Sequence, residues 1–165
     1  MRMQNNHATM PPVPIALCGK SSSMASSFAP TMLPEYEIVH HFQSLEAVQK
    51  ELTHLLRGES FTPTSGLGAD DNEAKNAHTA GPPRKPRAIM LGAGFSEDEL
   101  EQMLKVEGAD QVSWLFPDAL KSVGNVMTGP FFMTVLAKRV KACLQSNGIV
   151  EGEEGKAKGG EVYKF

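Results

Sequence analysis

Residues 13–23 read VPIALCGKSSS, and this stretch decides the fold. The apolar run from Val13 to Cys18 predicts a buried strand, Gly19 predicts a turn, and the serines that follow predict the start of a helix. A second unit of the same kind, RAIMLGAGFS, occupies residues 87–96. Two such units in one small chain indicate an α/β protein with an open parallel sheet, whose loops gather at the carboxyl ends of its strands.

The alternation of apolar runs and amphipathic segments predicts four strands and four helices. The strands are expected at about 13–18, 36–42, 87–92 and 111–116. The helices are expected at about 21–33, 44–57, 96–107 and 129–148, with Pro30 ending or distorting the first of them. Right-handed crossovers then give a small three-layer structure with strand order 2-1-3-4, a Rossmann- or flavodoxin-like arrangement. In this order the loops after the first and third strands face each other across one crevice.

The polar sequence is unevenly distributed, and this distribution predicts the domain organisation. Residues 1–12 are expected to be a disordered leader, and residues 13–148 a single α/β domain that contains a disordered loop at 59–86. Residues 149–165 are expected to be a flexible tail, although its end, Val162 to Phe165, is apolar enough to dock.

Composition excludes several classes of protein. The chain has 165 residues, a net charge of −3 and two cysteines, Cys18 and Cys143. A mildly acidic chain offers no basic face for nucleic acid, and two cysteines give no disulfide framework. The start of the chain lacks the apolar core of a signal peptide, and no run approaches the length of about 18 apolar residues that a membrane span needs. A cytoplasmic protein without membrane contact is therefore expected.

The sequence Gly19-Lys20-Ser21 resembles the end of a phosphate-binding loop. The complete motif needs a glycine five residues before Gly19, and that position is Pro14, so nucleotide hydrolysis is not expected. A weaker hypothesis is that Lys20, Ser21, Ser22 and the helix start hold an anion. The alternative is a tight turn whose serines only cap the helix.

The sequence Gly92-Ala93-Gly94 resembles a dinucleotide-binding turn, but the third glycine of that fingerprint is replaced by Glu97. Glutamate there would repel a pyrophosphate, so an NAD(P) cofactor is possible only in a degenerate site. Gly92, Gly94 and Ser96 are the expected second half of the anion site. The alternative for Ser96 is a capping box with Glu99.

Few residues suggest catalysis. Cys18, at a strand end beside a helix start, and Asp118, after the fourth strand, are the candidate catalytic groups. His40 and His41 are neighbours in one strand and point to opposite faces, so they cannot act on one ligand. His7 and His78 lie in predicted disorder, and no histidine or cysteine spacing predicts a metal site.

Four stretches resemble a group of small proteins of unassigned function from filamentous fungi: residues 14–20, 33–40, 86–92 and 114–118. Such proteins are often encoded near genes of secondary metabolism, and the resemblance implies that context without assigning catalytic residues. The first three strands are also similar to the flavodoxin-like small domain of D-2-hydroxyacid dehydrogenases. This chain lacks room for their nicotinamide domain, so that activity is not implied.

Three functions are consistent with these patterns. The first is an accessory or ligand-binding protein of fungal secondary metabolism that holds a small anionic metabolite in the crevice. The second is a pathway enzyme, either an NAD(P)-type oxidoreductase with a degenerate cofactor site or a cofactor-free isomerase or hydrolase. The third is an interaction module whose apolar tail docks on a protein partner or on a second copy of the chain.

Overall fold

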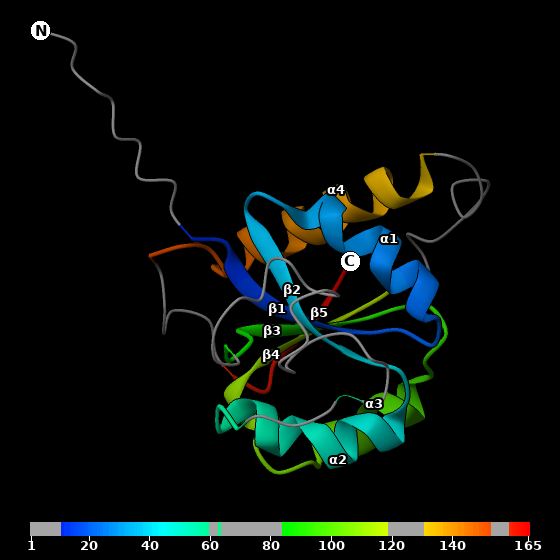
Figure 1. The fold of residues 1–165 in the computed structure, drawn as a ribbon, viewed down its shortest axis with the longest axis vertical. Helices are drawn as coiled ribbons and strands as arrows, with labels where there is room; N and C mark the ends of the chain where they lie inside the picture. The colour runs from blue at the N-terminus through cyan, green and yellow to red at the C-terminus, as the bar shows by residue number, and fades with distance from the viewer. Residues whose placement is uncertain (1–10, 60–62, 64–83, 119–130, 153–158) are drawn as a thin grey trace, which may run out of the picture.

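The computed structural model describes residues 11–59, 63, 84–118, 131–152 and 159–165. A single parallel sheet of five strands runs through the molecule in the order β2-β1-β3-β4-β5 (Figure 1). The strands are β1 (Val13–Cys18), β2 (Tyr36–Phe42), β3 (Ala88–Leu91), β4 (Ser113–Phe116) and β5 (Val162–Lys164). The predicted α/β class and the order 2-1-3-4 are confirmed, and β5 adds a fifth strand beside β4. The order 2-1-3-4-5 is that of flavodoxin-like sheets.

Among the described residues, four α-helices and one 3-10 helix lie between the strands. They are α1 (Ser22–Met32), α2 (Leu45–Leu56), α3 (Glu97–Leu104), the 3-10 helix η1 (Ala109–Gln111) and α4 (Phe132–Ser146). Side-chain caps explain where α2 and α3 begin. Ser44 Oγ accepts a hydrogen bond from the N–H of Ala47 (3.1 Å), and Ser96 and Glu99 form the complete capping box that their spacing predicts.

Pro30 lies inside α1 and does not end it, which leaves the other expectation, that it distorts the helix locally. It is exposed and lies only two residues before the end of the helix, so its ring and its missing N–H disturb a single turn. Phe28 and Met32 are buried on either side of it. Their packing on the sheet holds the last turn in helical form.

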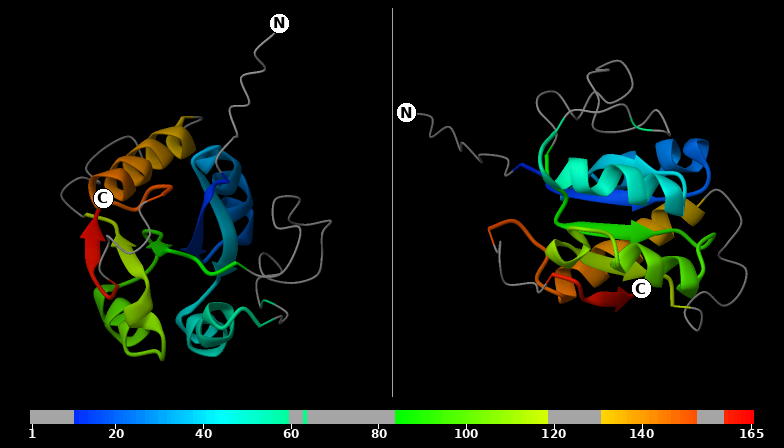
Figure 2. Two further views of the ribbon diagram at one scale, coloured as in Figure 1. Left: turned by 90° about the vertical axis from the view of Figure 1, so that its left-hand side faces the viewer. Right: turned by 90° about the horizontal axis from the view of Figure 1, so that it is seen from below.

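The helices cover the two faces of the sheet in pairs. Helices α2 and α3 pack on one face, and α1 and α4 pack on the other (Figures 1 and 2). The residues of β1, β3 and β4 alternate between the two cores, whereas a register shift in β2 places Tyr36 and Phe42 in different cores. In β1, for example, Ala16 and Cys18 belong to the α2/α3 core, whereas Ile15 and Leu17 belong to the α1/α4 core.

The last connection differs in hand from the other three. From β2 through β3 to β4 the chain moves across the sheet in one direction, and α2 and α3 lie on the same face. The step from β4 to β5 continues in that direction, yet α4 lies on the opposite face beside α1. The uniformly right-handed connections expected from the sequence therefore stop at β4. The physical reason is coverage, because without α4 the side chains of Met90 and Leu115 would face water.

The expected flexible tail, as far as the structure describes it (residues 149–152 and 159–165), makes specific contacts with the rest of the chain. Ile149 is buried, and its carbonyl accepts a hydrogen bond from Tyr36 Oη (2.8 Å). The N–H of Gly160 donates to Val112 O (2.7 Å), and Phe165 packs into the α1/α4 core after β5. Apolar burial at both ends of the segment outweighs its polar composition. The expected leader and the loop at 59–86 fall almost entirely outside the described residues.

Two glycines with positive φ allow a test of the packing between α2 and η1. A Cβ atom at Gly108 (φ 96°) would lie 2.8 Å from Leu56 Cδ1, whereas one at Gly58 (φ 70°) would meet nothing within 4 Å. We expect Gly58→Ala to lower the free energy of unfolding by about 1–2 kcal/mol through backbone strain alone. Gly108→Ala should lose about 1–3 kcal/mol more, because Leu56 is buried and must shift. Urea denaturation of both variants measures the difference, and equal losses would contradict this packing.

Candidate functional site

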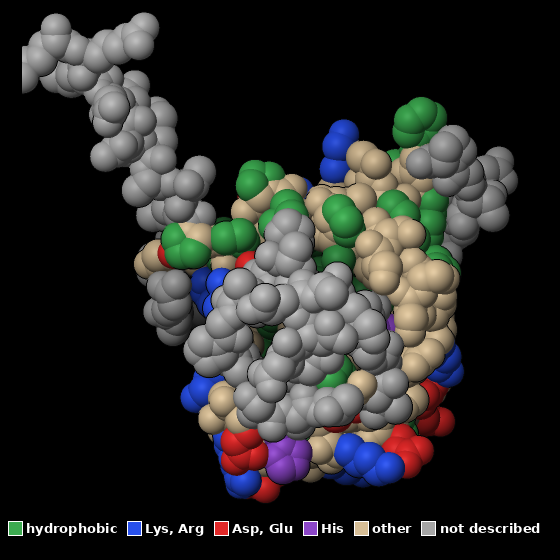
Figure 3. Space-filling view, viewed as in Figure 1, with side chains coloured by type: hydrophobic (Ala, Val, Ile, Leu, Met, Phe, Trp, Pro, Cys, Tyr) green, Lys and Arg blue, Asp and Glu red, His purple; other side chains and the backbone are tan. Residues whose placement is uncertain are grey.

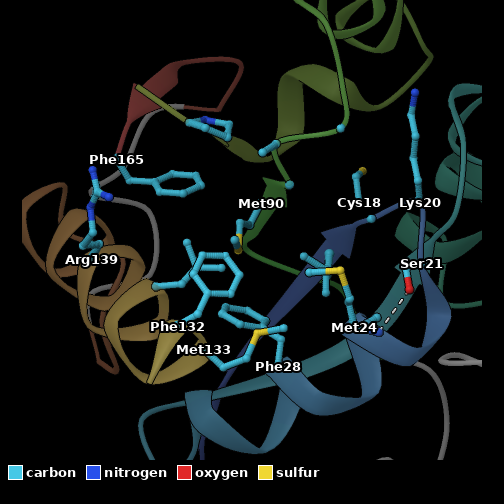
Figure 4. A pocket seen from close by; sticks show the side chains of 18 of the residues that line it. Cys18, Lys20, Ser21, Met24, Phe28, Met90, Phe132, Met133, Arg139 and Phe165 are labelled. Carbon is cyan, nitrogen blue, oxygen red and sulfur yellow. Dashed lines mark hydrogen bonds between the residues drawn. The ribbon is translucent and has the colours of Figure 1, made fainter. Parts of the chain in front are cut away.

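A pocket of about 470 Å³ lies between α1 and α4, at the carboxyl ends of β1 and β3 (Figure 4). Its volume is within the range of small-molecule sites, and in α/β sheets ligands bind at this edge, where the strand order reverses. Most of its wall is apolar. The apolar side chains are those of Leu17, Met24, Ala25, Phe28, Met90, Pro117, Phe132, Met133, Val135, Leu136 and Phe165.

Helical periodicity explains how two helices supply most of these apolar side chains. In α1, Met24, Ala25 and Phe28 lie on one face, at steps of one and three residues. In α4, the wall residues follow steps of one, two, one and three residues from Phe132 to Arg139. The floor comes from Leu17 of β1 and Met90 of β3. The same apolar stripes that hold the helices on the sheet therefore also line the pocket.

The two glycine loops expected to face each other do so. The N–H of Gly92 donates to the carbonyl of Cys18 (2.8 Å), which ties the β3–α3 loop to the end of β1. A Cβ atom at Gly94 would lie 3.3 Å from Lys20 Cδ, so the absence of a side chain allows the lysine stem to pass closely. The expected crevice is this edge of the pocket.

Five of the seven expected ligand-binding residues lie on the pocket wall: Gly19, Lys20, Ser21, Gly92 and Gly94. Their role in binding remains a prediction. Ser22 and Ser96 are not wall residues. Ser22 is the first residue of α1, and Ser96 caps α3 as the alternative reading proposed. Ser21 also caps its helix, since its Oγ accepts from the N–H of Met24 (3.3 Å).

Lys20 turns away from the apolar part of the pocket (Figure 4). Its Nζ lies 3.5 Å from Glu99 Oε1 and 5.1 Å from the centre of the Phe95 ring. The lysine side chain is 54% exposed, and such a surface ion pair contributes little to stability. Lys20 therefore joins the two loops at the rim and does not point at the pocket floor.

Of the two candidate catalytic residues, Cys18 is poorly suited to act as a nucleophile, and a catalytic role of Asp118 remains a prediction. Cys18 borders the pocket, but its side chain packs in the α2/α3 core, and burial raises the pKa of its thiol. A thiol held in its protonated form is a weak nucleophile. Asp118 follows the wall residue Pro117, and its backbone N–H donates to Phe165 O (2.7 Å). That bond assigns Asp118 a part in holding the end of the chain.

The surroundings of Gly92-Ala93-Gly94 do not favour a dinucleotide. A pyrophosphate would need the start of α3, where Glu97, Asp98 and Glu99 fill the first turn. The described residues contain no group of three or more histidine, cysteine or acidic side chains placed to hold a metal ion. His7 and His78 lie outside the described residues.

His40 and His41 point to opposite faces of β2, as their position in a strand predicts. His40 Nε2 lies 3.0 Å from Glu51 Oε1 of α2, and both side chains are buried. His41 Nε2 donates to the carbonyl of Gly19 (2.6 Å), at the loop that forms the pocket edge. Burial lowers the pKa of His41, and the hydrogen bond to Gly19 offsets part of that effect.

Sequence reasoning missed Arg139 and Phe165 as wall residues. Arg139 was expected on the exposed face of its helix, together with Lys138 and Lys141. Of these three only Lys138 is exposed, because Lys141 Nζ lies 2.7 Å from Glu35 Oε2 and Arg139 borders the pocket. The available signal was the spacing of seven residues between Phe132 and Arg139, which places both on one helix face.

Comparison with known proteins gives one relative. The chain is 27% identical over 148 residues to "Kojic acid related protein 6" of Aspergillus oryzae, and the match covers 86% of this chain and 84% of that protein. This likeness supports the fungal part of the resemblance noted from the sequence. No family model matches the chain, and no solved structure does. Among the described helices, none has the length and apolar character required to cross a membrane.

The buried state of His41 predicts a dependence of stability on pH. The pKa of an unfolded histidine is about 6.5 and that of His41 in the folded protein is lower, so the unfolded chain binds the proton more readily. The free energy of unfolding should therefore fall as the pH is lowered from 7.5 to 5.5. Urea denaturation of His41→Gln, whose amide N–H can still donate to Gly19 O, should show a smaller fall.

His54→Gln, which removes an exposed histidine of α2 paired with Glu59, is measured alongside as the comparison variant. The pKa of Glu35 is lowered by its hydrogen bond to Lys141, and it titrates below this pH window. An unchanged slope in His41→Gln would contradict the assignment to His41.

Proposed function

We propose that this protein binds a small, predominantly apolar organic molecule in the pocket between α1 and α4, and that it serves as a binding or accessory protein in fungal secondary metabolism. The observation that carries the proposal is the pocket itself. A wall of thioether, phenyl and aliphatic side chains at the switch point of a parallel sheet is the usual form of a small-molecule site.

The chemistry of the wall supports an apolar ligand. Met24, Met90 and Met133 contribute flexible, polarisable thioethers, which adapt to ligands of irregular shape and contact aromatic rings favourably. Phe28, Phe132 and Phe165 contribute flat apolar surfaces. Apolar molecules gain about 25 cal/mol for each Å² of apolar surface removed from water, so such a wall supplies affinity without specific hydrogen bonds.

The surface around the pocket supports the same proposal. Hydrophobic side chains gather on the α1/α4 side of the molecule in Figure 3, whereas most charged side chains in that view lie over α2 and α3. Among the described residues the two large hydrophobic side chains that are well exposed are Met24 (51%) and Phe131 (74%). Met24 lines the pocket, and Phe131 directly precedes the wall residue Phe132.

The relative supports the biological setting. Its name connects that Aspergillus oryzae protein with kojic acid, and the match covers most of both chains. An enzymatic role is less well supported, because the Cys18 thiol is buried in the α2/α3 core and acidic side chains fill the start of α3. The end of the tail, which one hypothesis assigned to a partner or a second copy, is used within the chain itself through Phe165.

Filling the pocket tests the proposal. The probe is N-phenyl-1-naphthylamine, a neutral dye whose fluorescence increases in apolar surroundings. We expect saturable binding to the unmodified protein and at least a tenfold weaker affinity for Met133→Trp, because the indole occupies the space of the ligand.

Thr134→Trp introduces the same side chain at the next position of α4, where the residue is exposed and not on the wall. This control should bind the dye as the unmodified protein does. The proposal fails if the dye does not bind at all, or if both tryptophan variants weaken binding equally.

A further inference from the structure

The pocket carries charge of only one sign among its described wall residues. Lys20 and Arg139 belong to the wall, and no aspartate or glutamate does. The two cations come from different elements, the β1–α1 loop and α4. A pocket with an apolar interior and a cationic rim favours a ligand that ends in a negative charge.

Lys20 is not the residue that we expect to bind the negative charge of the ligand. Its ammonium already lies beside the Glu99 carboxylate and against the Phe95 ring, and its stem runs along Gly94, away from the apolar side chains (Figure 4). A ligand anion near Lys20 would also lie near Glu99, and the two negative charges would repel each other. The exposure of Lys20 further weakens its field through solvent screening.

Arg139 is better placed to receive an anion. It is half-buried and lies beside Phe165 at the edge of the phenyl and thioether wall (Figure 4). Arg139 also interacts with other groups of the chain. A guanidinium carries five N–H donors in a planar fork, so it can bind a carboxylate in a bidentate manner while keeping another contact.

We infer that the pocket selects apolar carboxylic acids, with the apolar body of the ligand between α1 and α4 and its carboxylate on the guanidinium of Arg139. This inference rests on the proposed function and adds the chemical class of the ligand. It also moves the expected anion contact from Lys20 and the serines of the β1–α1 loop to a residue of α4.

A matched pair of ligands separates charge from apolar fit. The naphthyl compounds 2-naphthoate and 2-naphthamide have nearly the same size and differ in charge, and each can displace N-phenyl-1-naphthylamine from the pocket. At pH 7.5 we expect the acid to bind the unmodified protein at least about tenfold more tightly than the amide, a ratio that corresponds to about 1.4 kcal/mol. In Arg139→Gln the two affinities should become equal, while the amide and the dye still bind.

Two further variants complete the test. Lys20→Gln should keep the preference for the acid, because Lys20 is held at Glu99, and Arg139→Lys should restore part of it through its point charge. Equal binding of acid and amide by the unmodified protein would overturn the inference and leave the proposed function intact. Loss of the preference in Lys20→Gln but not in Arg139→Gln would overturn the assignment to Arg139. Failure of the dye itself to bind would instead refute the proposed function.

Discussion

The need to cover both faces of the sheet is the constraint on which the rest of the structure depends. Helices α2 and α3 fill one face, and α1 alone covers only the β1 and β2 side of the other. Met90 and Leu115 remain on that second face, and full burial of each side chain contributes about 1.5–3 kcal/mol. Placing α4 over them secures this energy and reverses the hand of the last connection.

The site follows from the same placement. Because α4 joins α1 on one face, the two helices enclose the space above the carboxyl ends of β1 and β3. Their apolar stripes line that space, and Gly19, Gly92 and Gly94 border its edge. The return of the chain as β5 then brings Phe165 to the wall. A single packing requirement thus determines where the pocket lies and why its interior is apolar.

Local patterns in the sequence were sufficient to predict the secondary-structure elements and the order of the first four strands. The run from Val13 to Gly19 and the capping box at Ser96 depend on neighbouring residues, so periodicity reveals them. Phe165 and Arg139 could not be placed in this way, because their positions depend on which face α4 covers. That choice is decided by burial of residues distant in the sequence, such as Met90 and Leu115.

The same dependence on distant residues explains why an anion site was expected where the structure has a mainly apolar pocket. Lys20 and the serines of residues 21–23 suggested an anion site because they stand next to a strand end in the sequence. In three dimensions Lys20 pairs with Glu99, and five wall residues come from α4, which is more than a hundred residues away. The glycine loops were located correctly, whereas the apolar character of the pocket needed the packed structure.

The most direct test of the central claim is methyl NMR spectroscopy of the protein labelled with ¹³C at its methionine methyl groups, titrated with N-phenyl-1-naphthylamine. The account predicts that the signals of Met24, Met90 and Met133, from three different elements, shift together through the ring current of the dye. The signal of Met103, buried on the opposite face, should stay in place. A shift of Met103 without the other three would contradict the claim that α1 and α4 enclose the binding site.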